Sequence, residues 1–133
     1  MYIIDTNTLI YFFKGMGKVP NKFLSISPKE IAIPSIVIYE LEYGIAKSSF
    51  PKKRQAQLKE MCSLVHILPF GDKEAFSSAS IRAKLEKKGT PIDPYDVLIA
   101  GTTIEHQGIL VTNNIKEFSR VPKLKIENWY SEE

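Results

Sequence analysis

Four carboxylates, Asp5, Glu40, Asp96 and Glu117, are the side chains whose types and positions suit chemistry. Carboxylate oxygens are hard ligands of the kind that Mg²⁺ and Mn²⁺ prefer. A metal ion held by such a cluster can bind a phosphate, activate a water and stabilise a leaving oxygen. Because no arrangement of Ser, Cys and His typical of a covalent nucleophile accompanies them, the pattern favours metal-assisted hydrolysis of a phosphodiester.

Asp5 and Asp96 each have a structural explanation that competes with metal binding. Asp5 ends a predicted strand, where Asp is also a common helix N-cap. Asp96 is the third residue of a helix that Asp93 can cap, so its carboxylate can complement the helix dipole. The apolar run at 97–100 indicates that this helix is buried, and an unpaired first-turn carboxylate is then costly. A bound metal ion would remove that cost.

Glu40 and the polar residues around Glu117 also have two interpretations. Glu40 borders an apolar helical face and precedes Gly44 by one turn, where the missing side chain leaves room for a ligand or another backbone. The alternative for Glu40 is a solvated charge. Polar residues directly after a strand usually form a turn, but Thr112, Asn114 and Glu117 can also complete a metal's outer shell or position a water.

Short strands and helices alternate along the chain, which predicts parallel strands joined by right-handed crossovers. Strands are predicted at residues 2–5, 31–33, 64–68, 109–112 and 125–127. Helices are predicted at residues 6–14, 35–47, 51–62, 72–88 and 93–106. Most of the candidate residues follow a strand or begin a helix, and in open α/β sheets this carboxyl edge is where ligands bind.

Helix starts and faces follow from a few residues. Ser35, Asp72 and Asp93 are predicted N-caps, and Pro94 strengthens the last of these. The helix at 72–88 is predicted to place four apolar residues on one side: Ala75, Phe76, Ala79 and Ala83.

Length and composition limit the class of protein. The 133 residues carry a formal net charge of +3, which is compatible with a nucleic-acid partner but is weak support for one. Cys62 is the only cysteine, which excludes an internal disulfide and a Cys-rich zinc site. His66 and His106 are interpreted as structural. No signal segment and no membrane-length apolar run occurs, so a soluble, cytoplasmic protein is expected.

Four short motifs occur in order along most of the chain, from residue 5 to residue 129. They are Ile4-Asp5-Thr6-Asn7, Ser35 to Gly44 around Glu40-Leu41, Pro91-Ile92 to Asp96 with Ile99-Ala100, and Val111-Thr112-Asn113-Asn114 with Glu117-Phe118. Together they resemble the motifs of PIN-domain ribonucleases, and most closely those of the VapC-type toxins of type II toxin–antitoxin systems.

The resemblance implies a fold, an activity and partners. The fold is a three-layer α/β/α sandwich with a mainly parallel five-stranded sheet, and residues 1–133 form a single PIN-like nuclease domain. The activity is Mg²⁺- or Mn²⁺-dependent endonucleolytic cleavage of a structured RNA such as a tRNA anticodon region. A cognate VapB-type antitoxin and a homodimer are the expected partners. The implied residues are the metal-binding and catalytic acids Asp5, Glu40 and Asp96, a further catalytic acid Glu117, and the supporting residues Thr6, Asn7, Thr112 and Asn114.

Two positions depart from the family pattern, and their roles stay open here. Many relatives have aspartate where this chain has Asn114, and either Asn114 or Glu117 completes the acidic site. Many relatives have glycine where this chain has Asp93, which either caps a helix or tunes metal affinity. Candidate contacts with RNA phosphates and bases are Lys14, Lys18, Lys52, Lys53, Arg54, Lys84, Lys87 and Lys88, and Tyr11, Tyr39 and Tyr95.

Two alternatives remain. A catalytically silent module of the same fold could bind RNA or an antitoxin without cutting. A receiver-like signalling domain also has an acid pocket that binds Mg²⁺, but it needs an Asp at the end of a central strand, and here Pro69-Phe70 follow the third strand with no Asp before Asp72.

Overall fold

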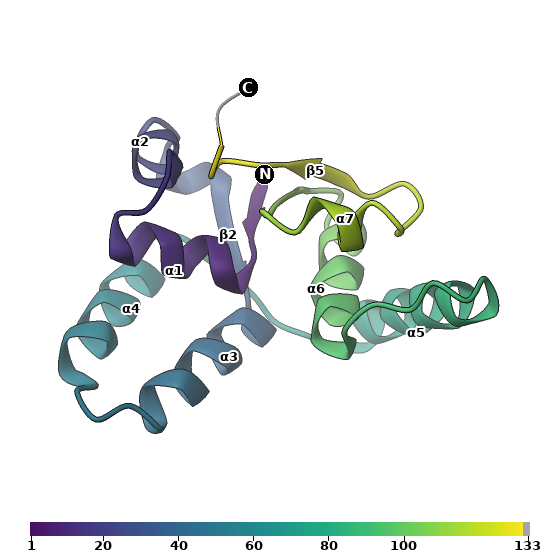
Figure 1. The fold of residues 1–133 in the computed structure, drawn as a ribbon, viewed down its shortest axis with the longest axis horizontal. Coiled ribbons are helices and arrows are strands. Elements are labelled where there is room, and N and C mark those ends of the chain that lie inside the picture. Colours follow the sequence, from purple (N-terminus) through teal and green to yellow (C-terminus); the bar gives the residue numbers. More distant parts are fainter. Residues whose placement is uncertain (132–133) are drawn as a thin grey trace.

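A sheet of five parallel strands lies at the centre of the computed structural model, which describes residues 1–131 (Figure 1). The strands are β1 (Tyr2–Ile4), β2 (Ile31–Pro34), β3 (His66–Leu68), β4 (Ile109–Val111) and β5 (Lys125–Glu127). Their order is β3-β2-β1-β4-β5, and every neighbouring pair is parallel. The predicted parallel five-stranded sheet is therefore confirmed, and β1 is its central strand.

Helices cover both faces of this sheet and complete the predicted three layers. They are α1 (Thr6–Lys14), α2 (Val19–Leu24), α3 (Ser35–Ala46), α4 (Lys52–Leu64), α5 (Asp72–Lys87), α6 (Pro94–Glu105) and α7 (Ile115–Phe118), with a 3₁₀ turn at Pro28–Glu30. In Figure 1, α1, α2 and α4 lie to the left of β1 and β2, whereas α5 and α6 lie to the right. Among the residues described, no helix has the length and apolar character needed to cross a membrane.

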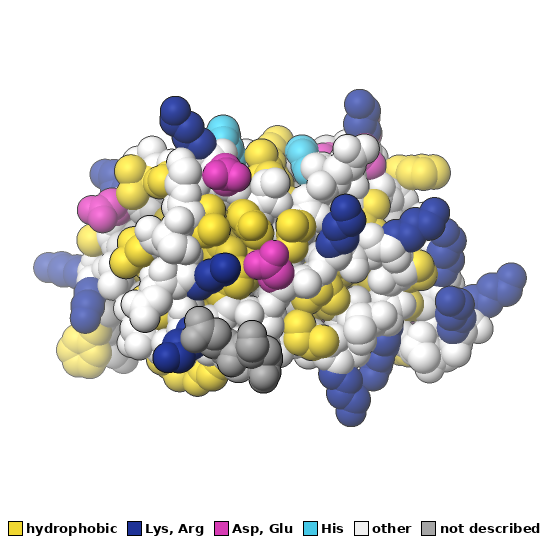
Figure 2. All heavy atoms as spheres, turned by 90° about the horizontal axis from the view of Figure 1, so that it is seen from above, with side chains coloured by type: hydrophobic (Ala, Val, Ile, Leu, Met, Phe, Trp, Pro, Cys, Tyr) yellow, Lys and Arg dark blue, Asp and Glu magenta, His cyan; other side chains and the backbone are white. Residues whose placement is uncertain are grey.

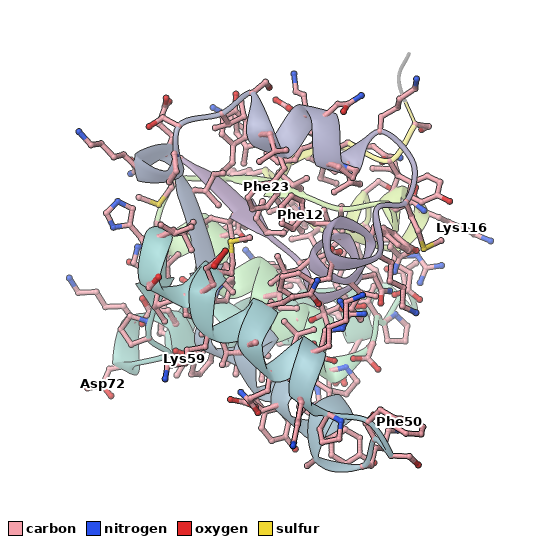
Figure 3. The ribbon with its side chains drawn as sticks, turned by 90° about the vertical axis from the view of Figure 1, so that its left-hand side faces the viewer. Phe12, Phe23, Phe50, Lys59, Asp72 and Lys116 are labelled. Atoms are coloured by element: carbon pink, nitrogen blue, oxygen red, sulfur yellow. The ribbon has the colours of Figure 1, made fainter. Side chains whose placement is uncertain are left out.

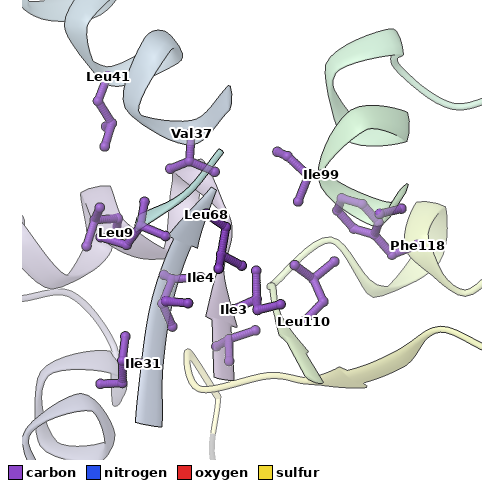
Figure 4. Close-up of a cluster of buried hydrophobic side chains, with 14 of the residues drawn as sticks. Ile3, Ile4, Leu9, Ile31, Val37, Leu41, Leu68, Ile99, Leu110 and Phe118 are labelled. Carbon is purple, nitrogen blue, oxygen red and sulfur yellow. The ribbon is translucent and has the colours of Figure 1, made fainter. Parts of the chain in front are cut away.

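The hydrophobic core lies between the sheet and the helices. Ile3 and Ile4 on adjacent positions of β1 are both fully buried, as a strand covered on both faces requires. Figure 4 shows them among side chains from the neighbouring elements, including Leu9, Val37, Ile99, Leu110 and Phe118. Burying each such side chain stabilises the fold by roughly 1.5–3 kcal/mol, so the strand that ends at Asp5 is held firmly.

The strand order reverses at one point of the carboxyl edge. From β1 the chain builds outward through β2 to β3, and then crosses back so that β4 pairs with the other side of β1. Ligands of open α/β sheets bind where the strand order reverses in this way, which here is between the ends of β1 and β4. A receiver-like domain has the order 2-1-3-4-5, so the strand order shows that the receiver alternative is wrong.

Several predicted helix starts differ from the structure. Ser35 is the first residue of α3, and Pro34 takes the cap position without a side-chain bond. Asp72 is likewise the first residue of α5, and Gly71 precedes it with its N–H donated to Oε1 of Glu74 at 2.9 Å. Asp93 is the N-cap of α6, as predicted.

The side of α5 that carries Ala75, Phe76, Ala79 and Ala83 does not face the core. The helix buries Glu74, Ser78, Ile81 and Leu85, whereas Ala75, Ala79, Ala83 and Phe76 are exposed. Helix α5 packs mainly against α6 through a polar face, because Glu74 bonds to His106 of the adjoining C-cap and Ser77 bonds to Glu105. The positions of the apolar residues alone therefore do not indicate which side of α5 is buried.

Candidate active site

Asp5 lies at the carboxyl end of β1 and caps α1. Its Oδ1 accepts the N–H of Thr8 at 2.9 Å, and its own N–H donates to the carbonyl of Val111 at the end of β4. Only 6% of the residue is exposed. Burial raises the pKa of Asp5, although hydrogen bonds from Thr112 and Thr8 oppose that rise. The N-cap interpretation is thus correct, and the same carboxylate lies at the switch point of the sheet.

Glu40 is turned toward the end of β1 by a hydrogen bond to α1. Thr6 Oγ1 donates to Glu40 Oε1 at 2.6 Å, which links the first turn of α1 to the middle of α3. Asn7, the other supporting residue of this motif, is exposed. At Gly44 no described atom lies within 4 Å of the position that a Cβ would take, so no other backbone approaches there.

Asp93 holds Asp96 in the first turn of α6. Oδ1 of Asp93 accepts the N–H of Tyr95 at 2.9 Å and the N–H of Asp96 at 3.4 Å. These bonds identify Asp93 as the helix cap, one of the two roles that the sequence left open. Asp96 is half-buried as the third residue of this helix, so its backbone is fixed while its carboxylate remains available to the site.

The segment after β4 forms a chain of hydrogen bonds that ends on Glu117. Thr112 is fully buried, and its Oγ1 accepts the N–H of Asn114 at 2.9 Å. Asn114 Nδ2 then donates to Glu117 Oε2 at 3.1 Å. The amide of Asn114 thus holds the carboxylate of Glu117, and which of the two completes the acidic site stays a prediction. The turn and the functional interpretations of this segment are therefore compatible.

Burial and the neighbouring carboxylates both raise the pKa of Asp96. Its pKa is raised from 3.8 to about 7, first by burial and then by the negative charges of Asp93, Glu117, Asp5 and Glu40. Within residues 1–131 the ion pairs are Arg82–Glu86 and His106–Glu74, so no basic side chain there neutralises the cluster. Like charges held together disfavour ionisation of each other, and a bound cation would relieve this repulsion.

The donor set fits a hard divalent cation, although the side chains are not already closed around one. Among the described residues, no three acidic, histidine or cysteine side chains are grouped tightly enough to hold a metal ion. Mg²⁺ is commonly held by only one or two carboxylates, with waters and substrate phosphate completing its shell. The uncompensated charge around Asp96 and the oxygen-only donors match that mode of binding.

Sequence reasoning missed the part that Thr8 plays in the site. Its backbone N–H donates to Oδ1 of the N-cap Asp5 at 2.9 Å, and its Oγ1 donates to the carbonyl of Val111 at 3.2 Å. This second bond joins the first turn of α1 to the end of β4, where the strand order reverses. Asp followed three residues later by Thr was the available signal, since that is the spacing of an N-cap and its N3 residue.

The remaining candidates are the two histidines and the basic side chains. Both histidines have structural partners, because His66 Nε2 lies 3.0 Å from the carbonyl of Lys29 and His106 Nε2 lies 2.9 Å from Glu74. Figure 2 views the molecule from the amino-terminal side of β1, and there Lys and Arg side chains lie both on the face and along its edges. The phosphate contacts of the lysines remain predictions.

The chain is similar to known proteins along nearly its whole length. The model of the PIN domain family matches residues 2–124. Ribonuclease VapC2 of Rickettsia felis is 40% identical over 134 residues, covering 97% of this chain and 98% of that protein. The tRNA(fMet)-specific endonuclease VapC of Salmonella typhimurium is 35% identical over 128 residues, covering 96% and 97%. The crystal structure of VapBC2 from Rickettsia felis, bound to a promoter DNA fragment, superposes with a TM-score of 0.89 and 39% identity over 96% of this chain and 98% of that one.

Proposed function

The chain belongs to the PIN-domain family and, within it, to the VapC endoribonucleases, and from this premise we propose that its carboxylate cluster cuts RNA with Mg²⁺ or Mn²⁺ bound. One observation carries the assignment of the site. Burial and, after it, the charges of four other carboxylates raise the pKa of Asp96 to about 7, and no ion pair among the described residues neutralises the cluster. A protein gains nothing in stability from such an arrangement, whereas a metal nuclease needs it.

We assign the residues their roles from where the structure holds them. Asp5 and Asp96 lie on the rigid end of β1 and the first turn of α6, and they are the proposed metal ligands. Glu40, held by Thr6, and Glu117, held by Asn114, are proposed to orient the attacking water. A divalent cation, when bound, supplies the positive charge that attracts the scissile phosphate and stabilises the transition state.

The proposed substrate is a structured RNA, in particular the anticodon region of a tRNA. Support comes from the relative in Salmonella typhimurium, whose name states an endonuclease specific for tRNA(fMet). At 35% identity over nearly the full length of both chains, we expect the two proteins to share the cleavage reaction. The surface residues that select a particular tRNA can differ between them. We propose further that residues 1–133 form one nuclease domain that works in the cytoplasm, as a homodimer.

The proposed protein partner is a cognate antitoxin, and the structure offers an apolar groove for it. A depression of about 450 Å³ between α1, α2 and α4 is lined mainly by apolar side chains, among them Phe12, Phe23, Leu24, Met61 and Leu64. Figure 3 shows Phe12 and Phe23 side by side in this region, and their rings stack at 4.4 Å between centroids. We propose that an apolar segment of the antitoxin occupies the groove, because structural neighbours such as VapBC2 are complexes of the two components.

The test is cleavage of purified tRNA by the protein freed of any antitoxin, with Mg²⁺ or Mn²⁺. We expect discrete fragments that disappear with EDTA and with Asp5→Asn. Asparagine caps helices as well as aspartate does, so this variant should keep its fold while losing a metal ligand. Asp72→Asn, at an exposed carboxylate on the start of α5, is the matched control and should cut normally. RNA binding without any cleavage by the wild type would instead identify a catalytically silent binding module.

A further inference from the structure

Two exposed tyrosines, Tyr39 of α3 and Tyr95 of α6, meet beside the carboxylate cluster. Their hydroxyl oxygens lie 3.4 Å apart and their ring centroids 5.7 Å apart, with the planes tilted by 44°. The residues are 54% and 41% exposed. These two residues, called the tyrosine pair below, thus bridge the helices that carry Glu40 and Asp96 while leaving much of each ring open to solvent.

The tyrosine pair lies on the rim of the site. Tyr39 directly precedes Glu40, and Tyr95 directly precedes Asp96. Because the contact between the two hydroxyls joins α3 and α6 one residue before each of these acids, the pair lies next to the acids.

Packing explains the other tyrosines near the site better than it explains this pair. Tyr11, also a candidate for base contact, packs edge-on against Tyr130 at 4.7 Å and is partly buried against the core. Tyr43 is exposed on α3, but Lys47 covers its ring at 4.7 Å. Neither member of the tyrosine pair belongs to the core cluster or to the side chains packed against it, so its open ring faces call for another explanation.

We propose that the tyrosine pair is a stacking platform for an unpaired RNA base next to the phosphate that is cut, an inference that rests on the proposed ribonuclease function. The acid cluster repels phosphates, so RNA must gain affinity there from contacts that need no positive charge. Stacking on aromatic rings is such a contact, and it accepts any base.

The spacing of the two rings also limits which RNA bases can stack on the pair. Aromatic rings in contact lie about 4.5–7 Å apart between centroids, so rings at 5.7 Å leave no space for a base between them. The base therefore stacks on an outer face of the pair. Bases inside a duplex already stack on both faces, so only a base in a loop or a single strand is available. The platform thus selects unpaired nucleotides at the cleavage position.

The experiment measures stacking directly, in EDTA so that nothing is cut. The probe is an RNA hairpin carrying 2-aminopurine in its loop, whose fluorescence falls when the base stacks, with a fully paired duplex of the same stem as reference. Tyr39→Leu and Tyr95→Leu remove each ring, and Tyr39→Phe and Tyr95→Phe keep it. Tyr43→Leu, at an exposed tyrosine on the same helix but outside the pair, is the matched control.

We expect each Leu variant to bind the hairpin about tenfold more weakly and to lose the fluorescence change. The Phe variants and Tyr43→Leu should stay within about twofold of the wild type, a window well below the effect of one lost stacking contact. Wild type that binds hairpin and duplex equally, or Phe variants as weak as the Leu variants, would overturn the proposal. So would Leu variants that bind RNA normally but change the oligomeric state, since the pair would then be a contact between copies of this chain.

A parallel cleavage assay with Mg²⁺ or Mn²⁺ separates this inference from the proposed function. Loss of stacking in variants that remain folded, in a wild type that cuts, supports both. A wild type that stacks the loop base but cuts no RNA contradicts the nuclease assignment alone, whereas cutting without stacking contradicts the platform alone.

Discussion

The fold disfavours the charged form of Asp96. Its pKa rises from 3.8 to about 7 because it is partly buried and faces Asp93, Glu117, Asp5 and Glu40. For an acid whose pKa is raised by folding, the neutral form is the one that the native state favours. Its contribution to stability is therefore full below about pH 4, is lost as the pH rises toward 7, and changes little above that.

Asp96→Asn should consequently stabilise the metal-free protein at neutral pH. In EDTA we expect its melting temperature to match that of the wild type near pH 4 and to exceed it by roughly 5 °C at pH 8, after allowance for the partial exposure of the carboxylate. Thermal unfolding monitored by circular dichroism across this range is the measurement. Excess Mg²⁺ or Mn²⁺ should raise the melting temperature of the wild type more than that of the variant. A variant less stable than the wild type at pH 8 would contradict this account.

Thr6 is a positioning residue whose hydroxyl holds Glu40 at 2.6 Å. Thr6→Val keeps the shape of the side chain but removes the donor, so Glu40 is free to turn away from the site. We expect cleavage to fall about 10- to 100-fold, the range typical of groups that orient a metal site, with unchanged thermal stability. Thr6→Ser restores the hydroxyl and should restore most of the rate. Equal loss in both variants would show that the methyl group, not the hydroxyl, matters.

The acids of the site could be predicted from the sequence because each stands at a boundary that apolar runs and helix signals mark. Their mutual arrangement could not. The bonds from Thr6 to Glu40 and from Asn114 to Glu117 join residues through side-chain directions that only the assembled fold sets. The position of Asp93 allowed two roles; its hydrogen bonds to the first turn of α6 show the cap, and an effect on metal affinity stays a prediction.

At the level of elements, strands and long helices were predictable where apolar residues repeat, and the misses have physical causes. Helix α2 contains Pro20 and is only six residues long, so its apolar residues gave no period. Helix α5 buries Glu74, whose Oε2 lies 2.9 Å from His106 Nε2 at the C-cap of α6, and Ser78, whose hydroxyl has no hydrogen-bond partner among the described residues. Tertiary contact thus determined what local propensity could not.

The contact between α5 and α6 depends on Gly101. A Cβ at this position would lie 2.0 Å from Oγ of Ser78 and under 3 Å from the Ser78 backbone. Gly101→Ala should therefore push the helices apart and destabilise the protein by about 2–3 kcal/mol, measured by denaturant unfolding. Ser78→Ala should not rescue it, because the backbone atoms remain in the way.

Gly44 of α3 supplies the matched control for this prediction. It is also a helical glycine, but nothing described lies within 4 Å of its Cβ position. Gly44→Ala should stabilise the protein by up to about 1 kcal/mol through helix propensity alone. A similar loss of stability in both variants would mean that close helix packing is not what Gly101 provides.

At the scale of the whole molecule, the site and the groove between α1, α2 and α4 are separate surfaces joined by α1. Asp5 caps the start of that helix, and Phe12 lines the groove further along it. Occupation of the groove can therefore be tested without touching the acids. Leu24 is suited to this, because it lines the groove and is 75% exposed, so its replacement leaves the core intact.

Leu24→Glu should weaken antitoxin binding at least tenfold while leaving RNA cleavage unchanged, since a charge is placed against an apolar partner. Isothermal titration of the purified antitoxin is the measurement. Phe76→Glu, at a residue 78% exposed on α5 and outside the groove, should bind normally. Equal affinity of the Leu24 variant and the wild type would place the partner elsewhere.

Because the central strand is made first, the order of synthesis governs when this nuclease can work. Strand β1 emerges from the ribosome long before β4, and the bond from Thr8 to Val111 spans 103 positions. At about 5–20 residues per second, that interval lasts roughly 5–20 s. Throughout it Asp5 has no neighbour at the end of β4 and Glu117 does not yet exist, so the nascent chain is harmless to the RNA around it.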